Sequence, residues 1–245
     1  MFQFKQFVIH QDLCAMKVTT DACLFGGWLA KEIQNSIPIT IGTHIQNILD
    51  IGTGTGLLAL MCAQKNPSSN IDAIEIEEGA FKQATENVAN SQFSKRIKII
   101  HEDVKRFFFP KKYDCIISNP PFYEKEIRSG NERKNIAHHH SGLLFEELLD
   151  IIKRNLSLIG SFYLLLPFKR NEEIRKILLK KDLFVSKIVF TKQSPVHSYF
   201  RIMIEGKLNR EGNAETIIEE ISIWDDQQQY TKEFKELLKD YYLYL

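Results

Sequence analysis

Short apolar runs alternate with longer segments of helical periodicity over most of this 245-residue chain. Apolar runs of about four to eight residues indicate buried strands, and apolar residues every three or four positions indicate amphipathic helices. The pattern predicts strands at 48–51, 71–76, 97–100, 113–118, 161–166, 185–190 and 199–205. It predicts helices at 57–64, 80–90, 143–156 and 172–180, the third with Ser141 as its N-cap. This alternation is typical of an α/β fold with a doubly wound, mostly parallel, seven-stranded sheet.

The two ends of the chain look like attachments to this core. The last two predicted strands are joined by too few residues for a crossover, so the last strand should be antiparallel. Residues 1–20 fit a short hairpin or arm, followed by one helix before the first core strand. Residues 231–244 predict a docking helix, expected to lie on the sheet, with Thr231 as its cap. Its apolar stripe consists of Phe234, Leu237, Leu238, Tyr241, Tyr242 and Leu245. We therefore expect a single domain over residues 1–245.

The composition is that of an ordinary globular protein, with 44% hydrophobic and 26% charged residues. No apolar run reaches the roughly 18 residues of a membrane span, so no membrane partner is expected. The N-terminus, MFQFKQFVIHQD, has no signal-peptide core, which favours a cytoplasmic location. The run His138–His140 is not expected to chelate an ion, because adjacent residues point in different directions. No metal site is expected, since the cysteines are scattered: Cys14, Cys23, Cys62 and Cys115.

Charge is distributed unevenly, although the formal net charge is only +1. Residues 169–201 carry nine basic and three acidic side chains, a local net charge of +6. Residues 105–134 carry eight basic and four acidic ones, a net of +4, and residues 202–245 five and ten, a net of −5. Basic segments suit a polyanion such as a nucleic acid, although charged runs are also common on solvated helix faces.

The segment LDIGTGTGLLAL places Gly52, Gly54 and Gly56 between the first core strand and its helix. Glycine permits a sharp turn and a close approach of the backbone to a ligand. The spacing satisfies the dinucleotide fingerprint, with Glu75 about 20 residues further on, placed to accept ribose hydroxyls. Asp50, just before the glycines, would repel a pyrophosphate and suits a cationic or amine-bearing ligand better. The residues therefore favour S-adenosylmethionine and leave a nicotinamide or flavin cofactor as the alternative.

Polar residues also follow the third and fourth predicted strands. Asp103 ends the third strand beside the glycine loop, where its carboxylate would either meet an adenine amine or act only as an N-cap. Asn119, Pro120, Pro121 and Phe122 follow the fourth strand, and the two prolines make a stiff, extended stop there. An amide held rigidly at a strand end is an odd choice for packing alone, so this tetrapeptide indicates a functional site.

With these motifs in this order, the chain resembles the class I S-adenosylmethionine-dependent methyltransferases. Within them it is similar to the amino-methylating branch marked by Asn-Pro-Pro-Phe or Asn-Pro-Pro-Tyr. The stretches FKQFVIHQDLCAMKVTTDACLFGGWL and YTKEFKELLKDYYLYL resemble the bacterial tRNA (adenine-N6)-methyltransferases that modify adenine 37 of valine tRNA. The resemblance covers essentially the whole chain. It implies a Rossmann-like fold, S-adenosylmethionine as cofactor, valine tRNA as partner, and Lys17 and Thr20 in a segment over the cofactor.

The resemblance also implies how the tetrapeptide works. The side-chain oxygen of Asn119, which also lies against the cofactor, and the carbonyl of Pro120 would accept the two hydrogens of the adenine amine. Phe122 would stack on the extruded base. The segment from Tyr123 to Gly142 resembles a substrate lid, and basic side chains would contact phosphates. The expected substrate-binding residues are Pro121, Tyr123, Arg128, Arg133, Lys134, Lys169 and Arg170.

Two other functions stay open. A protein glutamine N5-methyltransferase acting on release factors shares the Asn-Pro-Pro chemistry, because a side-chain amide is also planar. That family usually carries a separate helical N-terminal domain, whereas 49 residues precede Asp50 here. The other alternative is a non-catalytic RNA-binding module with the same fold.

Overall fold

The computed structural model describes residues 1–36, 46–121, 143–209 and 215–245. The strands of its main sheet are β3 (Gln46–Ile51), β4 (Ser69–Glu75), β5 (Ile97–His101), β6 (Tyr113–Ser118), β7 (Leu156–Pro167), β8 (Phe184–Lys192), β9 (Tyr199–Lys207) and β10 (Ile217–Ser222). The helices are α1 (Thr20–Ser36), α2 (Leu57–Lys65), α3 (Glu78–Ala89), α5 (Phe145–Asn155), α6 (Asn171–Lys180) and α7 (Lys232–Leu238), with short 3-10 turns η1 (Ser94–Arg96) and η2 (Phe168–Arg170). None of the helices in the described ranges is long and apolar enough to cross a membrane.

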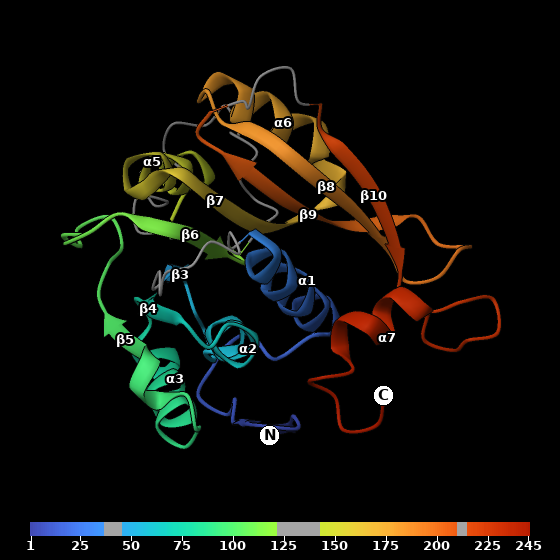
Figure 1. Ribbon diagram of the computed structural model, residues 1–245, viewed down its shortest axis with the longest axis horizontal. Helices are drawn as coiled ribbons and strands as arrows, with labels where there is room; N and C mark the ends of the chain where they lie inside the picture. Colours follow the sequence, from blue (N-terminus) through green and yellow to red (C-terminus); the bar gives the residue numbers. More distant parts are fainter. Residues whose placement is uncertain (37–45, 122–142, 210–214) are drawn as a thin grey trace, which may run out of the picture.

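The main sheet has the strand order β10-β8-β9-β7-β6-β3-β4-β5, with helices on both faces (Figure 1). β9 is antiparallel to both of its neighbours, β7 and β8, and the other pairs are parallel. The doubly wound, mostly parallel sheet with an antiparallel strand is therefore confirmed. The structure adds an eighth strand, β10, which the hydrophobic pattern did not predict. Four of its six residues are exposed, so it lacks the buried apolar run that marks the other strands.

Both faces of the central strands are buried, which explains why strands such as β3 and β6 read as continuous apolar runs. Successive residues of a strand point to opposite faces. Ile48 accordingly packs into the core under α1 and α2, whereas Leu49 packs into the core under α5 and α6. In the neighbouring strand β6, Ile117 belongs to the first of these cores and Ile116 to the second.

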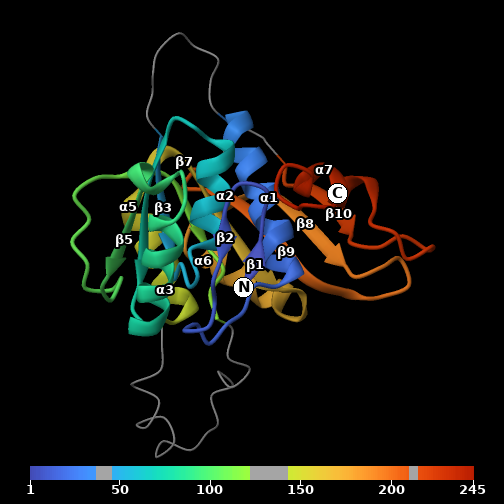
Figure 2. The same cartoon turned by 90° about the horizontal axis from the view of Figure 1, so that it is seen from below.

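The N-terminal residues form a two-stranded hairpin of β1 (Phe2–Gln3) and β2 (Val8–Ile9). Figure 2 shows this hairpin on the side of the sheet that carries α1, α2 and α3. Phe4 and Phe7 stack on one another and are buried in the core of that face. The Asn87 amide of α3 holds the next segment, since it donates to the carbonyl of His10 at 2.8 Å and accepts from its N–H at 2.9 Å.

The C-terminal helix α7 begins after Thr231, whose hydroxyl accepts a hydrogen bond from the Phe234 N–H at 3.3 Å. The helix ends at Leu238, several residues earlier than expected. It packs against α1 and reaches the sheet at β10, so helices make up much of its docking surface. A Cβ on Gly27 of α1 would lie 2.6 Å from the Leu237 carbonyl, which shows how closely the two helices approach. The Tyr241 hydroxyl donates to the Met61 carbonyl of α2 at 2.9 Å.

Helix α5 starts at Phe145, two residues later than predicted. The Leu144 N–H ahead of it donates to Glu147 Oε2 at 2.9 Å, which satisfies one donor at the helix start. Ser141, the predicted N-cap, lies outside the described residues.

Candidate active site

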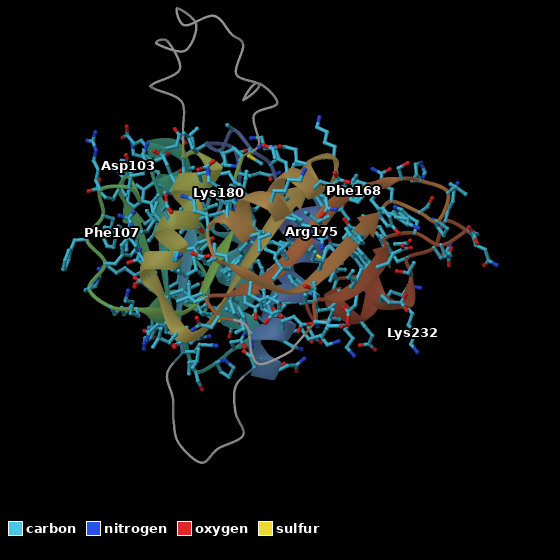
Figure 3. The ribbon with its side chains drawn as sticks, turned by 90° about the horizontal axis from the view of Figure 1, so that it is seen from above. Asp103, Phe107, Phe168, Arg175, Lys180 and Lys232 are labelled. Carbon is cyan, nitrogen blue, oxygen red and sulfur yellow. The ribbon has the colours of Figure 1, made fainter. Side chains whose placement is uncertain are left out.

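The candidate residues lie at one edge of the sheet, where the parallel strands end. Asp50 lies near the end of β3, Glu75 ends β4, and Asn119 directly follows β6. The register pairs Ile51 with Ser118, so the ends of β3 and β6 are side by side. In open α/β sheets this edge is the usual ligand site. Figure 3 shows Asp103, after β5, towards the same side of the molecule as Phe168, after β7.

The glycine loop is built from three residues with positive φ, at +70° in Gly52, +57° in Gly54 and +81° in Gly56. These angles strain any residue with a Cβ, so glycine is required at each. A Cβ on Gly52 or Gly54 would meet no atom within 4 Å, so the loop faces open space there. A Cβ on Gly56 would instead lie 3.6 Å from Ala84 of α3. The first two glycines therefore leave room for a ligand, and the third lies against a helix.

The Glu75 carboxylate braces this loop. Its Oε2 accepts a hydrogen bond from the Gly54 N–H at 2.9 Å, and Oε1 accepts from the N–H groups of Ile76 and Glu77, each at 2.9 Å. The side chain is only 8% exposed. Sequence reasoning gave Glu75 a ribose-binding role and missed this structural one. The two roles are compatible, because a carboxylate has about four lone-pair sites and three are used here.

The Asp50 carboxylate is completely buried at the base of the loop. Its Oδ2 accepts a hydrogen bond from the Thr53 hydroxyl at 2.6 Å. Its Oδ1 has no hydrogen-bond partner within the described part of the chain. Burial raises the pKa of Asp50 to about 7; the Thr53 bond opposes this shift, the Glu75 charge adds to it, and the Ala59 N–H favours ionisation slightly. A buried carboxyl group with a raised pKa and one oxygen without a partner fits a ligand that brings an amine or a positive charge.

Asp103 caps the turn after β5. Its Oδ1 accepts from the Lys105 N–H at 2.9 Å, and its Oδ2 lies 3.9 Å from Nε of Arg106. The capping role considered from the sequence is therefore present. The second oxygen, Oδ2, makes only a long contact with Arg106. The Asp103 side chain is 19% exposed, which leaves part of it accessible from outside.

The segment that contains Lys17 runs close to the glycine loop. The Leu13 N–H donates to Gln83 Oε1 of α3 at 3.2 Å. The Asn87 amide joins this segment to the loop, because it donates to the carbonyls of both His10 and Thr55, at 2.8 and 2.9 Å. The pKa of the Cys14 thiol is raised to about 11, first by burial and then by the negative charge of Glu75. Lys17 itself folds back, since Nζ donates to backbone carbonyls of its own segment at 2.6 and 3.0 Å. Thr20 begins α1 and is exposed.

The described part of the tetrapeptide follows β6 directly. The Ser118 hydroxyl, just before it, donates to the Ile51 carbonyl at 2.8 Å and ties the ends of β6 and β3 together. Asn119 and Pro120 are half-buried, and Pro121 is exposed. The structure thus brings Asn119 to the edge that carries Asp50. Several expected site residues lie outside the described residues, namely Phe122, Tyr123, Arg128, Arg133 and Lys134, as does the run His138–His140.

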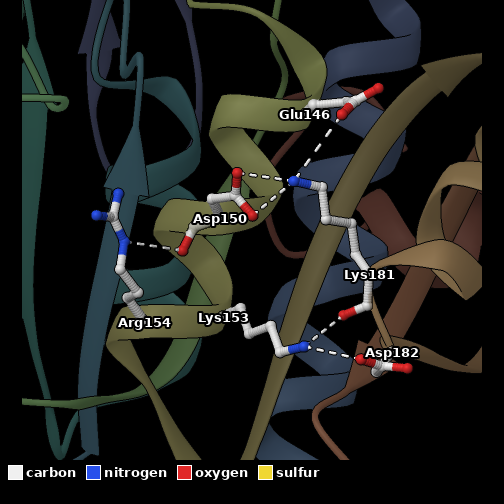
Figure 4. Close-up of polar contacts among 6 residues, drawn as sticks. All are labelled: Glu146, Asp150, Lys153, Arg154, Lys181 and Asp182. Carbon is white, nitrogen blue, oxygen red and sulfur yellow. Dashed lines mark hydrogen bonds and ion pairs between the residues drawn. The ribbon is translucent and has the colours of Figure 1, made fainter.

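Eight of the nine basic side chains of residues 169–201, all but Lys169, fall into two groups that the sequence did not distinguish. Figure 4 shows Lys181 bonded to both oxygens of Asp150 at 2.7 Å, with Glu146 at 3.9 Å. Five cations have carboxylate partners at 3.0 Å or less: Arg170 with Glu173, Lys181 with Asp150, Lys187 with Glu32, Lys192 with Glu220, and Arg201 with Asp21. Three exposed cations of α6 have no ion pair with another described residue: Arg175, Lys176 and Lys180.

Comparisons with known proteins agree with this geometry. The family profile described as "Methyltransferase small domain" matches residues 29–147. The tRNA1(Val) (adenine(37)-N6)-methyltransferase of Christiangramia forsetii is 39% identical over 249 residues, which cover 100% of this chain and 98% of that protein. The protein of the same name from Proteus mirabilis is 37% identical, over 99% of this chain and 94% of its own length.

Solved structures support the fold. A predicted O-methyltransferase from Agrobacterium tumefaciens superposes with a TM-score of 0.66 at 16% identity, over 90% of this chain and 96% of its own. A putative class I S-adenosylmethionine-dependent methyltransferase from Listeria monocytogenes gives a TM-score of 0.62 at 15% identity, over 87% and 68%. These likenesses confirm the expected Rossmann-like methyltransferase fold.

Proposed function

We propose that this chain, which belongs to the family of the tRNA1(Val) (adenine(37)-N6)-methyltransferases, methylates the N6 amine of an adenine in tRNA, at position 37 of valine tRNA. The cofactor is S-adenosylmethionine, as expected from the sequence, and the nicotinamide and flavin alternatives are no longer needed. The observation that carries the proposal is the position of Asn119 beside the ends of β3 and β6, at the edge of the glycine loop and Asp50. A cytoplasmic location is part of the proposal, since tRNA is the substrate.

The residues around the glycine loop would hold the cofactor. Asp50 Oδ1, buried without a partner among the described residues, would accept a hydrogen bond from a cofactor amine and offset its positive charge. A free lone pair of Glu75 would accept a hydrogen bond from a ribose hydroxyl, and the accessible oxygen of Asp103 would accept one from the adenine amine. Lys17 would lie over the bound molecule, whereas Thr20 lines a pocket further along the edge, with Gln193 and Trp224. When bound, S-adenosylmethionine supplies an electrophilic methyl group on its sulfonium.

The role of Asn119 follows from the weak nucleophilicity of an adenine amine, whose lone pair is delocalised into the ring. Two hydrogen-bond acceptors, the Asn119 side-chain oxygen and the Pro120 carbonyl, would take the two N–H groups and direct the lone pair at the methyl carbon. Asn is suited to this role because its amide accepts a hydrogen bond and stays neutral. Pro120 and Pro121 each have φ fixed by their own ring, which helps to keep the two acceptors in place.

Binding of the tRNA would involve the basic side chains next to this edge. Lys169 and Arg170 directly follow β7, the neighbour of β6 in the sheet. Arg175, Lys176 and Lys180 continue along α6 without carboxylate partners in the described ranges, so their charge is available to phosphates. Such contacts add affinity without reading sequence.

A methyl-transfer assay tests the proposal. We expect the protein to transfer a labelled methyl group to unmodified valine tRNA, and to lose this activity when adenine 37 is replaced by guanine. A Gly-Gly-Gln peptide serves as the competing substrate. Methylation of that peptide without methylation of tRNA would favour the glutamine alternative. The curated relatives that cover the whole chain all carry the tRNA methyltransferase name, so the glutamine alternative is not favoured.

A further inference from the structure

A pocket of about 280 Å³ opens further along the same sheet edge. The register places Lys192, the last residue of β8, beside Tyr199 at the start of β9 and Ser222 at the end of β10. The pocket lies just beyond these residues and is lined by Thr20, Asp21, Gln193, Phe200, Ile223 and Trp224. In the strand order β8 is three strands from β6, a distance of roughly 14 Å. The pocket is therefore on the edge that carries Asn119, beyond β7.

One wall of the pocket is a rigid aromatic ring. Trp224 stacks on Tyr230 with centroids 4.1 Å apart and planes at 18°, and Tyr230 stacks on Phe234 at 4.5 Å and 13°. Phe234 is fully buried, whereas Trp224 keeps 37% of its surface exposed. The backbone N–H of Trp224 also donates to the backbone carbonyl of Gln193 at 2.9 Å. Because one ring face is covered and the backbone is tied down, Trp224 offers a preordered surface to another flat ring.

The polar groups of the pocket suit an uncharged ring with hydrogen-bonding edges. Gln193 contributes an exposed amide, which can both donate and accept, and Thr20 contributes a hydroxyl. Asp21 Oδ2 accepts from Arg201 Nε at 2.8 Å, so the local charges balance. A phosphate in the pocket would meet the Asp21 carboxylate. A nucleobase would meet a stacking face and groups that match its edges.

We propose that this pocket is a nucleobase subsite, in which a base a few nucleotides from the target adenine stacks on Trp224. The inference rests on the proposed function, because an RNA strand crosses this edge when its target amine reaches Asn119. The subsite gives the enzyme a second point of recognition that depends on a flat ring and not on phosphate charge.

The test compares Trp224→Leu with Trp224→Phe, which keeps a flat ring, and with Tyr244→Leu, which removes a 94% exposed aromatic at the C-terminus. Binding of an anticodon stem-loop RNA is measured directly, at several salt concentrations. We expect Trp224→Leu to weaken binding by about 5- to 150-fold, the range for loss of one stacked base. The dependence of affinity on salt should not change, because no ion pair is lost. Trp224→Phe and Tyr244→Leu should stay within about 3-fold of the wild type, as should the S-adenosylmethionine affinity of all three.

Abasic nucleotides, placed one at a time in the loop of this RNA, locate the base. One abasic position should weaken binding to the wild type and cause no further loss with Trp224→Leu, because the same contact is already missing. If Trp224→Leu unfolds, as a melting curve would reveal, Gln193→Ala takes its place, since that side chain is exposed and should give the same abasic pattern with a smaller loss.

The outcomes separate the two proposals. Folded Trp224→Leu that binds the RNA as the wild type does would overturn the subsite, even if the wild type methylates tRNA normally. A wild type that binds RNA through Trp224 and transfers no methyl group would overturn the proposed function alone. A wild type that does not bind the RNA would overturn both.

Discussion

Raising the pH from about 6 to about 8 should tighten the binding of S-adenosylmethionine through Asp50. Burial raises the pKa of this carboxyl to about 7 in the protein without ligand. A cationic ligand beside Oδ1 stabilises the carboxylate and lowers that pKa, so binding is coupled to release of a proton. About a tenth of Asp50 is ionised at pH 6 and about nine-tenths at pH 8, so the dissociation constant should fall about 10-fold over this range.

Titration calorimetry at about pH 6, 7 and 8, in buffers with different ionisation enthalpies, measures both the affinity and the number of protons released. The matched control is Asp50→Asn, which keeps the shape and the Thr53 contact and has no proton to release. The ligand amine titrates near pH 8, but it does so equally with both proteins, so the ratio of their affinities isolates Asp50. The variant should bind more weakly at pH 8 and lose most of this difference at pH 6.

The same shift has a consequence for folding. The pKa of Asp50 in the folded protein lies above 3.8, the ordinary value for an aspartate, so the unfolded chain ionises first as the pH rises. The contribution of Asp50 to stability is therefore fully present below about pH 4 and is lost as the pH rises to about 7. Asp50→Asn removes this loss and should make the protein without ligand more stable near pH 7 than the wild type. Identical pH profiles of cofactor affinity for Asp50→Asn and the wild type would refute the reasoning.

Three further changes test the rest of the site. Asn119→Ala should lower kcat by about 100- to 1,000-fold in the methyl-transfer assay, with cofactor affinity nearly unchanged, because the lost acceptor acts on the amine; a wild-type rate would contradict the proposed chemistry. Replacing Arg175 and Lys176 of α6 together by Ala should weaken tRNA binding and reduce the slope of log affinity against log salt by about 2, because neither has a carboxylate partner in the described ranges. Lys232→Ala, at the start of α7, is its control and should leave that slope unchanged. Glu75→Ala removes an acceptor for three backbone N–H groups, so it should lower the free energy of unfolding by about 1–3 kcal/mol and with it the melting temperature. It should also weaken cofactor binding. Glu75→Gln should keep part of the stability and part of the affinity. Equal melting temperatures for Glu75→Ala and the wild type would show that the loop does not need this brace.

The sequence by itself determined the elements whose causes are local. Buried strands such as β3 and β6 are marked by continuous apolar runs, and the predicted ends of these two were right to within two residues. Strand β7 begins at Leu156, five residues before its predicted start, because its first residues lack such a run. The glycine loop follows from positive φ angles that only glycine adopts without strain. The stop after β6 follows from two prolines that cannot continue a strand. Together these patterns were sufficient for the fold class and for the order of the site residues along the chain.

The tertiary structure decided everything that depends on contacts between distant residues. Strand β10 is exposed, so only its pairing with β8 identifies it. The sequence has nine basic residues in 169–201, but it does not show which of them are free to bind phosphates. Carboxylates from other elements decide this: Lys187, for example, pairs with Glu32, 155 residues away. The pocket at Trp224 joins α1, the end of β8 and the end of β10, so no single segment carries a signal for it. Periodicity reports which face of an element is buried, whereas partners and pockets arise only when several elements meet.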